Sequence, residues 1–293
     1  MVRRFLVTAG ASLCLAAAAS AGAMASPITF TWDPSAPPIG TCTAATCSNI
    51  VADNMVVTDV AGVTIPGGPT GGAFTETAIL PIGLFELPPG TIITPQPSGY
   101  GSTYSLYFTA TLAGTQGPIP TKVGTASVIS FTTGSSYSFT LWATPNPTIS
   151  AKATSGTVAI TSKDTGAFPV ATGTLTSGSG TLLLTSSGYS PSVSLVFTFD
   201  PCSGAGTGAG GVCTGNETSF FVSPSFTAKL NLFGTFTADP TVVSVTSGPP
   251  GYVDINGGGG NLTLSAIPEP ASILALGVGL LGLGFVKRRS RYS

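Results

Sequence analysis

The residues able to do acid–base chemistry in this 293-residue chain are its carboxylates, because the sequence contains no histidine. Histidine is the usual general base near neutral pH and the commonest zinc ligand, so both kinds of site lose their main component. Two carboxylates can still hydrolyse a glycosidic bond between them. Nothing in the sequence places two of them at a working distance, so we do not expect an enzyme. The candidates for such a pair are Glu76, Glu86, Asp164, Asp200 and Glu217.

Two short motifs have the letters of a cofactor or metal site, and both have simpler interpretations. The run 206–211 matches a dinucleotide-binding loop, but no helical pattern follows it. Asp254 and Asn256 are spaced as at the start of a calcium loop, but the acidic residue that closes such a loop is missing. We therefore expect a flexible loop and a turn, with no cofactor and no metal. Calcium held by scattered carboxylates is the alternative.

Aromatic side chains exposed on a sheet can stack on sugar rings, and Trp32 and Trp142 are the candidate glycan contacts. Tyr100, Tyr107 and Tyr189 are further candidates. Packing in the core or at a sheet edge is the alternative, and it is the commoner fate of such residues.

The charge of residues 26–266 excludes one class of partner. This part of the chain has four lysines, no arginine and ten acidic residues, a net charge of −6. Nucleic-acid binding needs clustered cations against the phosphates, so we expect no nucleic-acid partner.

The same residues alternate between apolar and polar in short segments separated by glycine, proline, serine and threonine. In Ser102–Leu112, for example, Leu106 and Phe108 share a face, which is the period of a strand with one side buried. The segments show no fixed internal repeat, so we do not expect a β-solenoid. We predict that residues 26–266 form an all-β domain, as one or two sub-domains, with an antiparallel β-sandwich or jelly-roll-like fold. The run Gly257–Gly260 is expected to be a turn.

The N-terminus has the pattern of a secretory signal peptide. Arg3 and Arg4 precede an apolar segment at 5–19, and the small residues around Met24 form a cleavage signature. We predict that residues 1–25 are a signal helix that is removed by cleavage after Ala25. A second cleavage signature lies at 19–21.

Export bears on the cysteines. Cys14 lies in the predicted signal peptide, so four cysteines remain in the mature chain, an even number that favours disulfides outside the cytoplasm. Three pairings are available to four cysteines, and we prefer the two local ones. A metal site with four thiolates is the alternative. The residues concerned are Cys42 with Cys47 and Cys202 with Cys213.

The last 27 residues combine three features in a fixed order. Pro268, Glu269 and Pro270 come first, and an uncharged apolar run at 271–286 follows. As a helix this run reaches about 24 Å, somewhat short of the roughly 30 Å hydrocarbon core of a membrane. Basic side chains that extend to the interface make up part of the difference and keep their end on the cytoplasmic side. We predict a transmembrane helix, with a buried core helix as the alternative. The basic residues are Lys287, Arg288, Arg289 and Arg291.

This order resembles the PEP-CTERM sorting signal of exopolysaccharide-producing Gram-negative bacteria. The resemblance covers only residues 267–293 and carries no information about residues 26–266. It implies that an exosortase, a membrane-embedded cysteine protease, cuts the chain at or near Pro268, Glu269 and Pro270. It also implies export through the inner membrane, transient anchoring by the helix, and delivery to the cell surface or the extracellular space.

The expected function is therefore that of an exported structural protein of the cell surface or extracellular matrix. Such a protein would act in biofilm formation or flocculation, with exopolysaccharide as a partner. A carbohydrate-binding surface protein is the first alternative, and a carboxylate-based glycoside hydrolase is the second.

Overall fold

A computed structural model describes residues 26–35, 39, 42–162, 165–201, 221–223, 232–246 and 248–266. The predicted signal peptide at 1–25 and the predicted sorting segment at 267–293, with its helix at 271–286, lie outside these residues. Within the described residues, no helix is long and apolar enough to cross a membrane. The chain divides into two compact units, and the unit Pro27–Ser265 contains the folded sheet.

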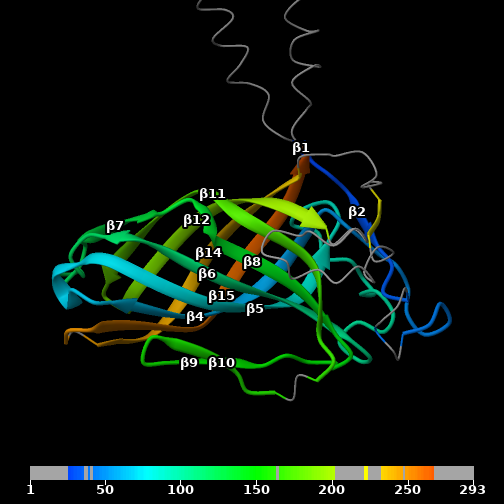
Figure 1. The fold of residues 1–293 in the computed structure, drawn as a ribbon, viewed down its shortest axis with the longest axis horizontal. Coiled ribbons are helices and arrows are strands. Elements are labelled where there is room, and N and C mark those ends of the chain that lie inside the picture. Colours follow the sequence, from blue (N-terminus) through cyan, green and yellow to red (C-terminus); the bar gives the residue numbers. More distant parts are fainter. Residues whose placement is uncertain are drawn as a thin grey trace, which may run out of the picture. The chain divides into compact units, whose positions relative to one another are not determined.

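Strands are the dominant regular structure of the described residues, so the all-β prediction is confirmed (Figure 1). Among these residues the one helical element is the 3-10 turn η1 (Gly68–Thr70). The strands are β1 (Ser26–Pro27), β2 (Phe30–Trp32), β3 (Ile50–Ala52), β4 (Asn54–Ile65), β5 (Gly72–Glu86), β6 (Ser105–Gln116), β7 (Ala126–Phe131), β8 (Gly134–Thr144), β9 (Ala151–Thr154), β10 (Thr157–Ile160), β11 (Phe168–Thr185), β12 (Gly188–Pro201), β13 (Phe221–Ser223), β14 (Leu232–Thr246) and β15 (Gly251–Ala266).

The main sheet is closed on itself, which corrects the prediction of a sandwich or jelly roll. The strand order begins β4-β5-β6 and ends β11-β12-β14-β15. Between β6 and β11, β7 and β8 together fill one strand position, each pairing with a different part of both neighbours. Strand β15 pairs with β4 and completes an antiparallel barrel of eight strand positions. The alternation of apolar and polar residues shows that each strand has one buried face, which is true of a sandwich and of a barrel. The pairing of β15 with β4 is what distinguishes the two folds here.

The closing strand contains the glycine run that was expected to be a turn. In the structure Gly257–Gly260 lies within β15, and the register with β4 shifts between Asn256 and Gly259. Gly257 and Gly258 have φ of 125° and 91°, which only glycine adopts readily. The run is therefore a bulge in a continuous strand, and the turn prediction is wrong.

The inner face of the barrel carries the expected alternation. On β6, Leu106, Phe108 and Leu112 are buried, as the period of two predicts. Phe139 of β8 packs against Phe197 of β12 with ring centroids 4.9 Å apart. The two rings meet across β11, where Gly173 has no side chain to separate them.

A second, smaller core lies on the outside of the barrel. The hairpin β9–β10 packs beside β4 and β5 (Figure 1). Ile79, Tyr107 and Ile149 are buried there, and Trp142 packs against them. The hairpin approaches the barrel so closely that a Cβ atom on Gly62 would lie 2.5 Å from the backbone carbon of Gly156.

Asp254 of β15 holds the turn of this hairpin. Its carboxylate accepts hydrogen bonds from the backbone N–H of Ser155 at 3.0 Å and of Gly156 at 2.8 Å, and from the hydroxyl of Ser244 at 2.7 Å. Asn256 adds two hydrogen bonds to the backbone of Ala153. The side chains that resemble the start of a calcium loop are thus occupied by the hairpin.

Replacing Asp254 should therefore loosen the hairpin. Asp254→Ala leaves two backbone donors without their acceptor, and we expect a loss of about 2–4 kcal/mol in the free energy of unfolding. Ser244→Ala removes one of the three hydrogen bonds and should cost about 1 kcal/mol. Urea denaturation measures both losses. An Asp254→Ala protein as stable as the wild type would show that the carboxylate does not hold the hairpin.

Candidate functional site

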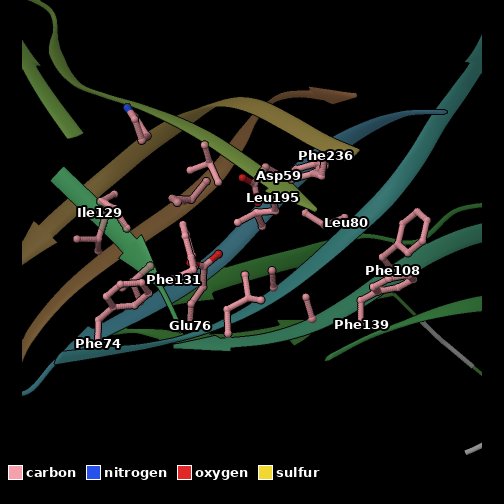
Figure 2. A pocket seen from close by; sticks show the side chains of 18 of the residues that line it. Asp59, Phe74, Glu76, Leu80, Phe108, Ile129, Phe131, Phe139, Leu195 and Phe236 are labelled. Atoms are coloured by element: carbon pink, nitrogen blue, oxygen red, sulfur yellow. The ribbon is translucent and has the colours of Figure 1, made fainter. Parts of the chain in front are cut away.

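The barrel encloses a hollow with an almost wholly apolar lining (Figure 2). The space open to the centres of water molecules is about 70 Å³. Leu80 and Val193 point into it and keep part of their surface uncovered, so protein atoms do not fill the interior completely. Six phenylalanines contribute to the lining: Phe74, Phe108, Phe131, Phe139, Phe197 and Phe236.

Two carboxyl groups point into this apolar space. Figure 2 shows Asp59 from β4 and Glu76 from β5 directed inward, among leucine and phenylalanine side chains. Asp59 is only 5% exposed, and its Oδ1 has no hydrogen-bond partner. Glu76 keeps part of its surface uncovered toward the hollow. Among the described residues that line the hollow, these two are the ionisable ones.

The surroundings oppose ionisation of both groups. Burial raises the pKa of Asp59 to about 7. Burial also raises the pKa of Glu76 to about 8, and the negative charge of Asp59 adds to this effect. The cause is the loss of water around the charged form, with no cation among the described lining residues to replace it.

A third polar group lies at one end of the hollow. Gln116, the last residue of β6, is 6% exposed, and its Nε2 has no hydrogen-bond partner. It pairs with Ile129 of β7 and also lines the hollow. The apolar interior therefore contains three polar side chains, and two of them, Asp59 and Gln116, have an atom without a hydrogen-bond partner.

Sequence reasoning named Glu76 as a candidate and missed Asp59 and Gln116. Asp59 occupies an inward position of β4, between the lining residues Val57 and Val63. An acid at a buried position of an alternating strand is unusual and can indicate a functional site. The sequence alone does not show which face of β4 is buried, so Asp59 could not be singled out.

The other carboxylate candidates are not brought together with Glu76. Glu86 lies ten residues further along β5, roughly 33 Å away at the rise of a strand, too far for a catalytic pair. Its Oε2 accepts hydrogen bonds from Asn54 at 2.6 Å and from the backbone of Gly90 at 2.8 Å. Asp164, Glu217 and the side chain of Asp200 lie outside the described residues.

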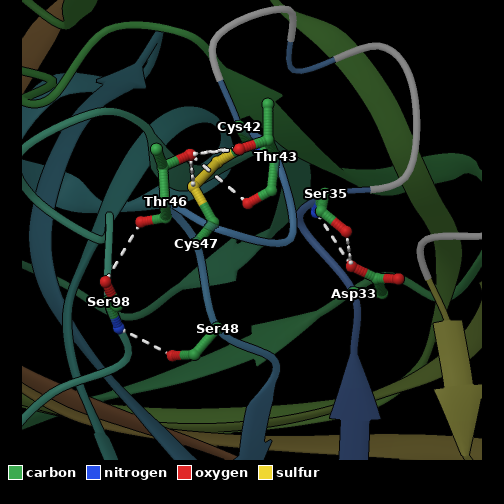
Figure 3. The surroundings of a disulfide bond; sticks show 8 residues. All are labelled: Asp33, Ser35, Cys42, Thr43, Thr46, Cys47, Ser48 and Ser98. Carbon is green, nitrogen blue, oxygen red and sulfur yellow. Dashed lines mark hydrogen bonds between the residues drawn. A yellow bond between two sulfur atoms is a disulfide. The ribbon is translucent and has the colours of Figure 1, made fainter.

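One predicted disulfide is present. Cys42 and Cys47 are joined, with their Cα atoms 5.5 Å apart (Figure 3), so the local pairing is confirmed for this pair. Gly99 packs against the bond, and a Cβ atom there would lie 2.5 Å from Sγ of Cys47. Cys202 and Cys213 lie outside the described residues, and their pairing stays a prediction.

The two tryptophans differ in their environment. Trp32 is fully buried and stacks on Phe30 at a centroid distance of 4.5 Å, with Phe85 edge-on at 6.2 Å. The structure thus gives its ring a packing role and leaves it no exposed face for a sugar. Trp142 is half-buried, lies parallel to Tyr107, and donates a hydrogen bond to Thr109 at 2.9 Å.

The three tyrosine candidates are also held by the protein. Tyr107 is 3% exposed. Tyr100 donates its hydroxyl to the carbonyl of Ile82, and Tyr189 donates its hydroxyl to the carbonyl of Pro120 at 2.9 Å. Both rings keep partial exposure.

The sorting residues Pro268, Glu269 and Pro270 and the basic residues at 287–289 and 291 lie outside the described residues. Comparison with known families does bear on them. The PEP-CTERM protein-sorting motif matches residues 266–289, as the resemblance predicted. The match supports an exported protein that an exosortase sorts to the cell surface of a Gram-negative bacterium. No curated protein and no solved structure matches the chain.

The two interior carboxyl groups should make stability depend on pH in a defined direction. Between the unfolded pKa near 4 and the folded values of about 7 and 8, the folded state binds more protons than the unfolded state. The protein should therefore be most stable below about pH 4 with respect to these groups, and lose stability as pH rises to about 8. For Asp59 alone the loss approaches roughly 4 kcal/mol.

Urea denaturation between pH 4 and 9 measures this dependence. Asp59→Asn combined with Glu76→Gln should flatten it and make the protein more stable than the wild type at pH 8, with each single change giving part of the effect. If the double variant lost stability with pH just as the wild type does, the two carboxyl groups would not be buried as the structure places them.

Proposed function

We propose that this protein is an exported structural component of the cell surface or extracellular matrix, acting together with exopolysaccharide in biofilm formation or flocculation. The observation that carries the proposal is the match of the PEP-CTERM protein-sorting motif at residues 266–289. The resemblance stated above links this motif to bacteria that make exopolysaccharide. The protein is then a substrate of the sorting protease and has no catalytic part in the sorting.

Three groups of C-terminal residues have different roles in sorting. Pro268 and Pro270 favour an extended backbone at the cut, which suits presentation to a protease. The apolar run at 271–286 holds this segment at the membrane, and the basic residues that follow fix its orientation. After cleavage the anchor is lost and the domain at 26–266 passes to the surface or the matrix.

Two features of the described domain support an extracellular location. Closure leaves the main sheet without the two edge strands that could pair with other chains, which favours solubility at high local concentration. The Cys42–Cys47 disulfide persists in an oxidising compartment.

Carbohydrate binding is the second candidate function, and it depends on Trp142. This ring is half-buried on the outer side of the barrel and lies parallel to Tyr107. An aromatic side chain that is held by its neighbours and still partly exposed can stack on a sugar ring at low cost in side-chain entropy. Trp32 supports no such role because it is fully buried.

The mature protein from its own cells tests the proposal. Intact mass and terminal sequencing should give a chain that starts at Ser26 and ends near Pro268. Replacing Pro268, Glu269 and Pro270 together by alanine should leave a chain that still carries Val286 and the basic tail, because the protease loses its recognition site.

The matched control changes three residues of the tail and leaves the motif intact: Ser290→Ala, Tyr292→Ala and Ser293→Ala. It should be processed like the wild type. A triple alanine motif variant that was cut and delivered normally would contradict sorting through the motif.

A further inference from the structure

We propose that the hollow of the barrel binds a small organic amine, a ligand with an apolar body and one ammonium group. The site consists of Asp59 and Glu76, set in the apolar lining. This inference concerns the interior alone, so it stands or falls separately from the sorting of the chain.

The charge of the interior points to a cation. Buried carboxylates are normally paired with a basic side chain or fully hydrogen-bonded. Among the described residues that line the hollow there is no lysine or arginine, and Oδ1 of Asp59 has no partner although the residue is 5% exposed. An ammonium group has three donors and no acceptor, so it matches an interior that presents carboxylate oxygens.

The lining determines the rest of the ligand. Phe108, Phe139 and Phe197 lie in the same apolar interior as the carboxyl groups. An aliphatic body gains from burial against these rings, and a cation near a ring face gains further. The free space of about 70 Å³ is less than half the roughly 150 Å³ of a cavity that admits benzene. The ligand is therefore a short aliphatic amine, with about three carbons.

The proton balance of binding can be written directly. An amine that enters as the free base takes the proton of a protonated carboxyl group and forms an ammonium–carboxylate pair, with no net proton release. An ammonium ion that enters instead displaces this proton into solution. Asp59 and Glu76 are the titratable groups facing the ligand from the described strands around it. Affinity should rise with pH up to about 8 as they ionise, then level off until the amine loses its own charge.

Three probes of nearly the same shape separate the contributions. Propylamine carries the cation, 1-propanol is neutral, and propionate carries the opposite charge. Titration calorimetry on the mature protein at pH 8 should show propylamine binding at least about tenfold more tightly than 1-propanol, because a charge-assisted pair in an apolar site is strong. Propionate should not bind.

Asp59→Asn with Glu76→Gln should reduce the propylamine affinity by about tenfold or more and leave the 1-propanol affinity unchanged. This variant is expected to be stably folded, since it removes two buried acids. Asp33→Asn removes a carboxylate that bonds to Ser35 outside the hollow, and it should bind propylamine like the wild type.

Three results would overturn the proposal. The first is no propylamine binding at millimolar concentration, and the second is equal binding of propylamine and 1-propanol. The third is an unchanged propylamine affinity in the double variant, which would place the ligand elsewhere on the protein.

Discussion

The pairing of β4 with β15 is the constraint on which the rest of the structure depends. Eleven residue pairs join these strands, from Asn54–Thr263 to Ile65–Gly251. The pairing removes the two edges that an open sheet would leave, and it separates an inside from an outside. Asp59 and Glu76 lie in an apolar interior only because this seam is shut. Their raised pKa values are thus a consequence of closure.

Closure also explains why the same strands carry polar groups on both faces. The outward carboxylate of Asp254, on the closing strand, is fully used by the hairpin and by Ser244. The inward carboxylate of Asp59, on the neighbouring strand β4, has an oxygen with no partner. One acid has a structural role, and the other imposes a cost on folding. A valine at position 59 would avoid this destabilisation. The buried acid is therefore consistent with an interior that binds a ligand.

Local patterns were sufficient for part of this description. Alternation predicted β6 and the all-β class, short spacing predicted the Cys42–Cys47 pair, and the order of three features predicted the sorting motif. Closure could not be predicted, because β4 and β15 lie about 200 residues apart and each has the same alternation in a sandwich. The glycine bulge was missed because a run of glycines is also typical of a turn, and its place within β15 depends on the same pairing with β4.

Residue-resolved amide hydrogen exchange across the sheet tests closure most directly. In an antiparallel pair, alternate amides of a strand donate to opposite neighbours. If β4 and β15 are paired, consecutive amides from Met55 to Val63 and from Leu262 back to Val253 should be protected, apart from the bulge at Gly257–Gly258. If instead every second amide of both strands exchanged as in an unfolded chain, the two strands would be open edges, and both the barrel and its interior site would be wrong.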